Sequence, residues 1–332
     1  MRRVRPATFL KWMQLFWERP ETEAAGRGDL YFCYRLFLGR RPDPEGWENW
    51  SASIRNGISR RQLVSAFLSS LEFRRRYSFH ERERVEIDGV AMFVDKSDHA
   101  VSSSILGEHT YEQHVTDALK RELKPDHVFL DIGCSIGWFV LLAAPRLTSG
   151  KVIGIEPNHN NLQILYRSIA ANRFENVVIH PYAATEKRVL LQLGYDAAYG
   201  FVHSPEDVSD DDYVQGVAMD ELLQHEPRID VVKLDIEGHE PVAIRGMQQL
   251  IARHRPVLLS EFHPKLMKDH ANEDPIAYFN ALRNFGYRIS VLTFEGKEVP
   301  VASADEIMSH WRSVNAAHGS HDTVHLDILA RF

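Results

Sequence analysis

The chain has 332 residues, a formal net charge of −7 and only two cysteines, Cys33 and Cys134. Its composition, 44% hydrophobic and 26% charged, is typical of a globular protein with a sizeable core. The negative charge disfavours nonspecific nucleic-acid binding, and two cysteines cannot build a disulfide framework. The sequence shows neither an apolar run near the roughly 20 residues of a membrane span nor a secretory cleavage site. We therefore expect a cytoplasmic protein.

The sequence pattern changes near residue 80, so we expect two domains, 1–80 and 81–332. The first should be a small all-α domain, because apolar residues at helical spacing predict helices over 7–17, 29–38, 47–56 and 59–68. The string LFLGRRPDPEGWENW resembles the helical module of phycobilisome-linker-like and bacterial surface-associated proteins. The resemblance covers about residues 27–77 and implies docking to a protein or a membrane surface rather than chemistry.

After residue 80, short apolar runs alternate with helical patterns. Strands are predicted at 128–132, 152–156, 177–181, 231–234, 257–260, 288–294 and 324–330, and a less regular stretch at 190–217 as a hairpin-like flap with a loop. Apolar strands separated by helices are typical of a parallel sheet covered on both faces. We therefore expect an α/β fold with a doubly wound, mostly parallel seven-stranded sheet, whose last two strands form an antiparallel edge.

The first of these apolar strands ends in a glycine loop, Asp131-Ile-Gly133-Cys-Ser-Ile-Gly137. A dinucleotide site needs G-x-G-x-x-G for its pyrophosphate, which this loop lacks and which the Asp131 carboxylate would repel. That carboxylate suits a cation, such as the ammonium group of S-adenosylmethionine. Glu156 ends the next strand, where an acid can accept hydrogen bonds from both ribose hydroxyls. The two acids together favour S-adenosylmethionine over a nicotinamide cofactor.

From about residue 85 to 332 the chain resembles class I S-adenosylmethionine-dependent methyltransferases of the FkbM family. The matching motifs are YEQHVTDALKRELKPDHVFLDIGCSIGWF, GIEPNHNNLQILYRSIAANRFENV, MDELL, IDVVKLDIEGHEPVAIRGMQQL and PVLLSEFHP. The family commonly has Ala-Asn where this chain has Cys134 and Ser135. The resemblance implies a Rossmann-like domain and methyl transfer, usually to a hydroxyl oxygen of a sugar or polyketide-type acceptor.

The expected cofactor site gathers residues that follow the strands. It comprises Asp131, Gly133, Cys134, Ser135, Gly137, Glu156, Asn158, Ala183 and Asp235. For Asn158 the alternative role is a helix cap, and for Ala183 it is a tight turn. Small side chains at 183 would let the adenine edge reach backbone groups.

Two clusters that follow later strands are the candidates for acceptor chemistry, because an alcohol needs a base or a metal to lose its proton. Catalytic candidates are Asp235, Glu237, His239 and His263. We prefer His239 as the base, because an ordinary imidazole has a pKa near neutrality, with Asp235 or Glu237 orienting it or the methionine moiety.

These four side chains and Glu261 could instead hold a divalent cation, but we assign no metal ligand, since such oxygen and nitrogen sets are common in metal-free sites. Glu237 and Glu240 have a further explanation as first-turn acids of a helix.

The sequence therefore predicts an O-methyltransferase acting on a small-molecule or glycan acceptor. The alternatives are a nicotinamide-dependent oxidoreductase and a non-catalytic cofactor-binding scaffold that is recruited through the helical module.

Overall fold

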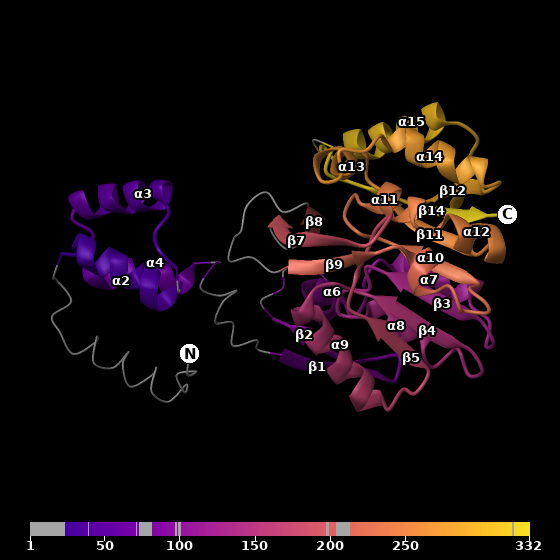
Figure 1. Ribbon diagram of the computed structural model, residues 1–332, viewed down its shortest axis with the longest axis horizontal. Helices are drawn as coiled ribbons and strands as arrows, with labels where there is room; N and C mark the ends of the chain where they lie inside the picture. The colour runs from indigo at the N-terminus through magenta and orange to yellow at the C-terminus, as the bar shows by residue number, and fades with distance from the viewer. Residues whose placement is uncertain are drawn as a thin grey trace. The chain divides into compact units, whose positions relative to one another are not determined.

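The computed structural model describes residues 24–38, 40–70, 72, 82–96, 98, 101–196, 199–203, 213–320 and 322–332. The chain divides into two compact units, Met1–Glu81 and Arg82–Phe332 (Figure 1). The helix predicted over 7–17 lies outside the described residues. None of the helices in the described part of the chain combines the length and the hydrophobicity that crossing a bilayer requires.

Among its described residues the first unit has the helices α2 (Arg27–Phe37), α3 (Pro44–Arg55) and α4 (Arg60–Ser69). Each lies within a few residues of a predicted helix. Ser59 caps α4, because its hydroxyl accepts a hydrogen bond from the Gln62 amide at 3.2 Å. The helices enclose a small core of their own, in which the rings of Tyr34 and Phe67 pack edge to face with centroids 4.9 Å apart.

The second unit is built on an eight-stranded sheet with the order β13-β12-β14-β11-β10-β3-β4-β5. The strands are β3 (Val128–Ile132), β4 (Lys151–Ile155), β5 (Val177–His180), β10 (Val231–Leu234), β11 (Val257–Phe262), β12 (Arg288–Leu292), β13 (Glu298–Val301) and β14 (Leu326–Arg331). From β5 to β11 all neighbours are parallel, whereas β14 is antiparallel to both its neighbours. The predicted α/β class, the mostly parallel sheet and the antiparallel edge are confirmed.

The strand count differs from the prediction of seven. The additional strand, β13, is a four-residue edge strand that contains Pro300 and pairs only with β12 among the described strands. Proline is tolerated at a sheet edge because no neighbour needs its missing N–H, but so short a segment with a proline gives a weak strand signal. The helix that follows it, α15 (Ala304–Ala317), was also not predicted.

Helices cover both faces of the sheet (Figure 1). Alternate residues of a strand face opposite sides, so Leu130 packs with residues from α11, α12, α14 and α15, whereas Phe129 packs with residues from α7, α8 and α9 and from the hairpin β1–β2. These elements are β1 (Arg82–Ile87), β2 (Val90–Asp95), α7 (Gln113–Glu122), α8 (Trp138–Ala143), α9 (His159–Asn172), α11 (Glu240–Arg245), α12 (Gln248–His254) and α14 (Pro275–Asn284). The remaining short helices are α6 (Val101–Glu108), α10 (Met219–Leu222) and α13 (Pro264–Asp269). The predicted doubly wound arrangement is therefore confirmed.

A second, smaller sheet occupies much of the stretch expected to be irregular. Its four strands, in the order β6-β9-β7-β8, are β6 (Ala183–Ala184), β7 (Val189–Asp196), β8 (Tyr199–His203) and β9 (Tyr213–Val217). The predicted hairpin corresponds to β7 and β8, which pair antiparallel. The loop predicted to follow it falls mostly outside the described residues.

Candidate functional site

A cavity opens at the carboxyl ends of β3, β4 and β10. Its wall contains the residues that directly follow these strands, 133–135, 156–158 and 235–237. Strand order reverses here, since β4 lies on one side of β3 and β10 on the other. Open α/β sheets bind ligands at such a switch point. The small sheet closes another part of the wall with Leu193 and Val202.

Most of the residues expected at the cofactor site line this cavity. They are Gly133, Cys134, Ser135, Glu156, Asn158, Ala183 and Asp235. Of the catalytic candidates, Asp235, Glu237 and His239 line it as well. Asp131, Gly137 and His263 lie outside the lining that the described residues form.

The two glycines of the first loop serve contacts within the protein. Gly133 has a φ of +84°, and a Cβ atom there would lie 1.8 Å from the carbonyl oxygen of Asp235. A Cβ at Gly137, φ +94°, would lie 2.2 Å from Cδ1 of Leu165. Glycine is therefore needed because the loop after β3 touches the loop after β10 and the helix α9.

The Glu156 carboxylate holds the loop after β3 and the start of α9 together. Its Oε2 accepts a hydrogen bond from the Ser135 amide at 2.9 Å, and its Oε1 accepts one from the Asn158 amide at 2.8 Å. Burial raises the pKa of Glu156 to about 7, although these hydrogen bonds oppose the shift. Each carboxylate oxygen has more than one lone pair, so Glu156 can still accept from a ligand in the cavity. Asn158 also caps α9, since its Oδ1 accepts from the Asn160 amide at 2.9 Å.

Asp131 lies behind the cavity wall rather than on it. The residue is 0% exposed, and neither carboxylate oxygen has a hydrogen-bond partner among the described residues. Burial raises the pKa of Asp131 to about 7, and the nearby Lys233 ammonium opposes that shift. The structure thus offers no direct contact between Asp131 and a group in the cavity, which differs from the expected grip on an ammonium.

Lys233 is a cavity residue to which the sequence analysis assigned no role. It is 4% exposed, and its register places it beside Asp131 on the next strand. The Nζ atom lies 2.7 Å from Oδ2 of Asp235 and 4.4 Å from the ring centroid of Phe139. Burial lowers the pKa of Lys233, but Asp235 and other carboxylates outweigh it and raise the pKa. The sequence signal for this residue is a lysine inside the apolar run VVKL. Such a lysine is expected to be buried and paired with a carboxylate, because buried lysines are rare unless they are paired.

The two candidate histidines are neutral at pH 7. Burial lowers the pKa of His239 to about 4, and burial together with His325 lowers the pKa of His263 to about 4. The expectation of a His239 pKa near neutrality was therefore wrong, because an enclosed imidazolium loses its hydration. His263 caps α13, where its Nδ1 accepts a hydrogen bond from the Leu266 amide at 3.4 Å.

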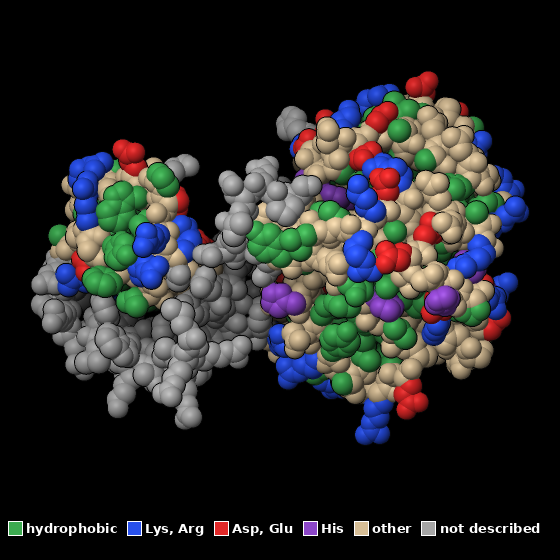
Figure 2. All heavy atoms as spheres, viewed as in Figure 1, with side chains coloured by type: hydrophobic (Ala, Val, Ile, Leu, Met, Phe, Trp, Pro, Cys, Tyr) green, Lys and Arg blue, Asp and Glu red, His purple; other side chains and the backbone are tan. Residues whose placement is uncertain are grey.

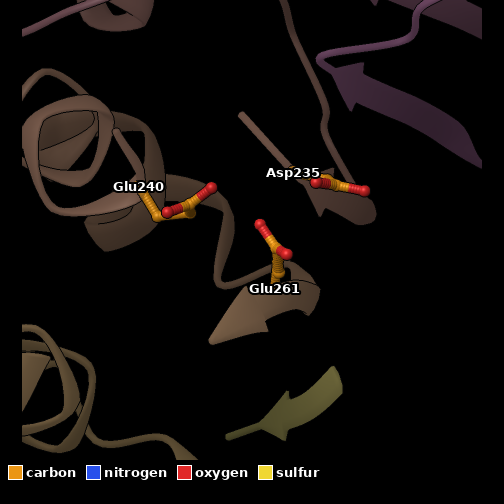
Figure 3. Close-up of side chains that lie close together, drawn as sticks. All are labelled: Asp235, Glu240 and Glu261. Atoms are coloured by element: carbon orange, nitrogen blue, oxygen red, sulfur yellow. The ribbon is translucent and has the colours of Figure 1, made fainter. Parts of the chain in front are cut away.

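Acidic side chains gather where the ends of β10 and β11 meet α11. Asp235, Glu240 and Glu261 each bring one potential ligand atom within 4.8 Å of the others (Figure 3). Burial raises the pKa of Glu240 to about 7 and the pKa of Glu261 well above its usual range. Glu237 lines the cavity beside them, and burial, then Asp235, raises its pKa to about 8. No single stretch of sequence shows this cluster, since its members come from separate elements.

Comparison with known proteins agrees with this architecture. Residues 131–289 match the methyltransferase FkbM domain, and residues 14–77 match a domain of unknown function, DUF4214. Over 61 residues the chain is 34% identical to the 23S rRNA (uracil(1939)-C(5))-methyltransferase RlmD of Alcanivorax borkumensis, a stretch that covers 18% of this chain and 13% of that protein.

Similar solved structures include methyltransferase FkbM from Methylobacillus flagellatus KT, at 18% identity and a TM-score of 0.37. That match covers 78% of this chain and 54% of the M. flagellatus chain. Another is precorrin-6y C5,15-methyltransferase from Geobacter metallireducens GS-15, at 14% identity and a TM-score of 0.38, covering 68% of this chain and 91% of that one.

The family match decides between the activities that the sequence left open. It covers the glycine loop, Glu156 and both acidic clusters, and it supports methyl transfer over oxidoreductase chemistry and over a scaffold without catalysis. The methyltransferase fold implies S-adenosylmethionine as the cosubstrate. Residues 131–289 therefore form a methyltransferase FkbM domain, and residues 14–77, which precede it, match the DUF4214 domain of unknown function.

Proposed function

We propose that this enzyme moves the methyl group of S-adenosylmethionine to a hydroxyl oxygen of a glycan, a sugar-containing molecule or a polyketide-type acceptor. The observation that carries the proposal is that one cavity is lined both by Glu156 on the nucleoside side and by Asp235, Glu237 and His239. A net charge of −7 disfavours a nucleic-acid acceptor.

The donor half of the cavity suits a nucleoside with an amino-acid tail. In the proposal Glu156 accepts hydrogen bonds from the ribose hydroxyls of S-adenosylmethionine. The backbone of 133–135 lies alongside the bound donor, and Ala183 leaves room for the adenine edge. Asp235, held by Lys233, faces the methionine end. Above its pKa of about 7, the ionised Asp131 acts from behind the wall through its charge. The donor, when bound, supplies an electrophilic methyl group, and the protein supplies alignment.

The acceptor half requires a group that takes a proton from the hydroxyl. We assign this role to His239, whose neutral imidazole lines the cavity at the end of β10, with Asp235 and Glu237 orienting it or the acceptor. His263 lies outside the lining, so we give it only a positioning role at the start of α13.

The acceptor class can be tested with methyl-labelled S-adenosylmethionine and fractionated extract of the source cells. We expect label in glycan or small hydroxylated metabolites, and label confined to RNA or protein would contradict the proposal. His239→Ala should reduce turnover about 10²–10⁴-fold while leaving S-adenosylhomocysteine affinity nearly unchanged. The matched control is His225→Ala, which removes an exposed histidine after α10 and should leave turnover unchanged.

For the first eighty residues we propose a docking role towards a protein or a membrane surface. Helix α2 exposes Tyr31, Phe32 and Leu36. Figure 2 shows hydrophobic side chains at the surface of this unit, flanked by Lys and Arg. We expect deletion of this unit to change where the enzyme is recruited, measured by co-sedimentation with cell fractions, without changing its donor binding.

A further inference from the structure

Three carboxylates from separate elements converge on one small volume next to the cavity. Asp235 follows β10, Glu240 opens α11, and Glu261 lies near the end of β11. One oxygen from each lies within 4.8 Å of the others. Figure 3 shows the three side chains reaching towards a common space.

Two of these carboxylates are buried with an oxygen that has no protein donor. Glu240 is 0% exposed and Glu261 is 6% exposed, and the Oε2 atom of each has no hydrogen-bond partner among the described residues. A buried polar atom without a partner is costly. These unpartnered oxygens therefore indicate that a further, positively charged group binds there. The short distances between the carboxylates would not by themselves indicate this.

The other oxygen of each carboxylate is held by the protein. Lys233 Nζ donates to Oδ2 of Asp235 at 2.7 Å, and the Ile236 amide donates to Oε1 of Glu240 at 2.8 Å. His325 Nδ1 lies 3.2 Å from Oε1 of Glu261. Such outer contacts orient ligand side chains around a metal and leave their remaining oxygens available.

We propose that Asp235, Glu240 and Glu261 bind one hard divalent cation, such as Mg²⁺, Mn²⁺ or Ca²⁺. Carboxylate oxygens are the ligands these ions prefer. Three atoms at most 4.8 Å apart lie within about 2.8 Å of a common point, against about 2.0–2.6 Å in magnesium and calcium sites. A closure of about 0.2–0.8 Å would therefore bring the three oxygens to bonding distance, and water or the acceptor would supply the remaining ligands.

The place of this cation in the reaction rests on the proposed function. Asp235 belongs both to the carboxylate triad and to the cavity wall, so the ion would adjoin the acceptor. There it would polarise the acceptor hydroxyl and make its proton easier to remove. From the sequence we assigned no metal ligand, because such oxygen and nitrogen sets are common in metal-free sites, and Glu240 was explained as a first-turn acid of its helix.

Binding is tested directly with Mn²⁺, by electron paramagnetic resonance of the full chain after chelator treatment and dialysis. This measurement needs no acceptor, so it can fail or succeed independently of the proposed function. We expect one Mn²⁺ per chain, displaced by excess Mg²⁺ or Ca²⁺. Glu261→Gln and Glu240→Gln should weaken Mn²⁺ binding about tenfold or more, since each removes a charged ligand.

The matched control is Glu112→Gln. Glu112 is a half-buried acid outside the triad, whose Oε2 lies 3.9 Å from Lys233 Nζ and has no hydrogen-bond donor among the described residues. Its variant should bind Mn²⁺ within about threefold of the parent. Melting curves identify any variant that fails to fold. If Glu240→Gln does not fold, Glu261→Gln tests the same cation site. Absence of a bound Mn²⁺ in the parent, or equal weakening by Glu112→Gln, would overturn the proposal.

Discussion

The substitution Asp131→Asn tests whether burial or Lys233 controls the charge of the acid behind the cavity wall. Asparagine has nearly the same shape as aspartate but does not ionise. Burial holds the pKa of Asp131 at about 7 in the folded protein, against about 4 in an unfolded chain. The folded state therefore binds this proton more tightly than the unfolded state does.

The difference of about 3 pH units sets the size of the effect. Each unit corresponds to about 1.4 kcal/mol, so the parent should lose about 4 kcal/mol of stability relative to Asp131→Asn as the pH rises from about 4 to about 7. The stabilising contribution of the neutral carboxyl is complete below about pH 4. It decreases as the pH rises and is fully lost once the pH has passed the folded-state pKa of about 7. Above about pH 7 the difference between the two proteins should level off.

The assay is urea denaturation of both ligand-free proteins at pH 5, 6, 7 and 8. Burying the asparagine amide adds a constant amount to the free energy of unfolding of the variant. That constant does not affect how the difference in unfolding free energy between the two proteins changes with pH. Glu175→Gln, which removes an exposed carboxylate, controls for the change in net charge. A difference that stays constant between pH 5 and 7 would refute the reasoning, because it would show Asp131 ionised in the fold with Lys233 as its counter-ion.

Three further outcomes follow from the geometry. Glu156→Ala should weaken S-adenosylhomocysteine binding by about 1.5–3 kcal/mol, or roughly 10- to 150-fold, and unchanged affinity by calorimetry would count against the ribose role. Gly133→Ala should cost about 2–6 kcal/mol of unfolding free energy, because it strains a φ of +84° and drives a Cβ atom against the Asp235 carbonyl. The control Gly28→Ala, in open space on α2, should instead stabilise by about 0.5–1 kcal/mol; equal melting shifts in the two variants would contradict this. Deletion of residues 1–80 should leave S-adenosylhomocysteine binding intact, since the two units have separate cores, and a loss of folded protein on truncation would show the opposite.

The sequence predicted the sheet because its signals are local. Apolar runs such as 128–132 and 231–234 are buried on both faces, and the helices between them leave parallel pairing as the natural arrangement. The glycine loop and Glu156 were also predicted, since each directly follows a strand and parallel strands end at the same edge. Weak local signals were missed: β13 is short and contains Pro300.

Sequence order by itself determined the α/β class, the edge of the sheet that holds the site and part of the cavity wall, including Ser135, Glu156 and Asp235. Only the tertiary structure decided which residues contact those side chains and how deeply they are buried. Contacts and burial together set their charge states. Register and packing place Asp131 beside Lys233, Glu261 beside His325, and His239 in a buried position that keeps it neutral. Burial and pairing depend on atoms far apart along the chain, so no local pattern encodes them.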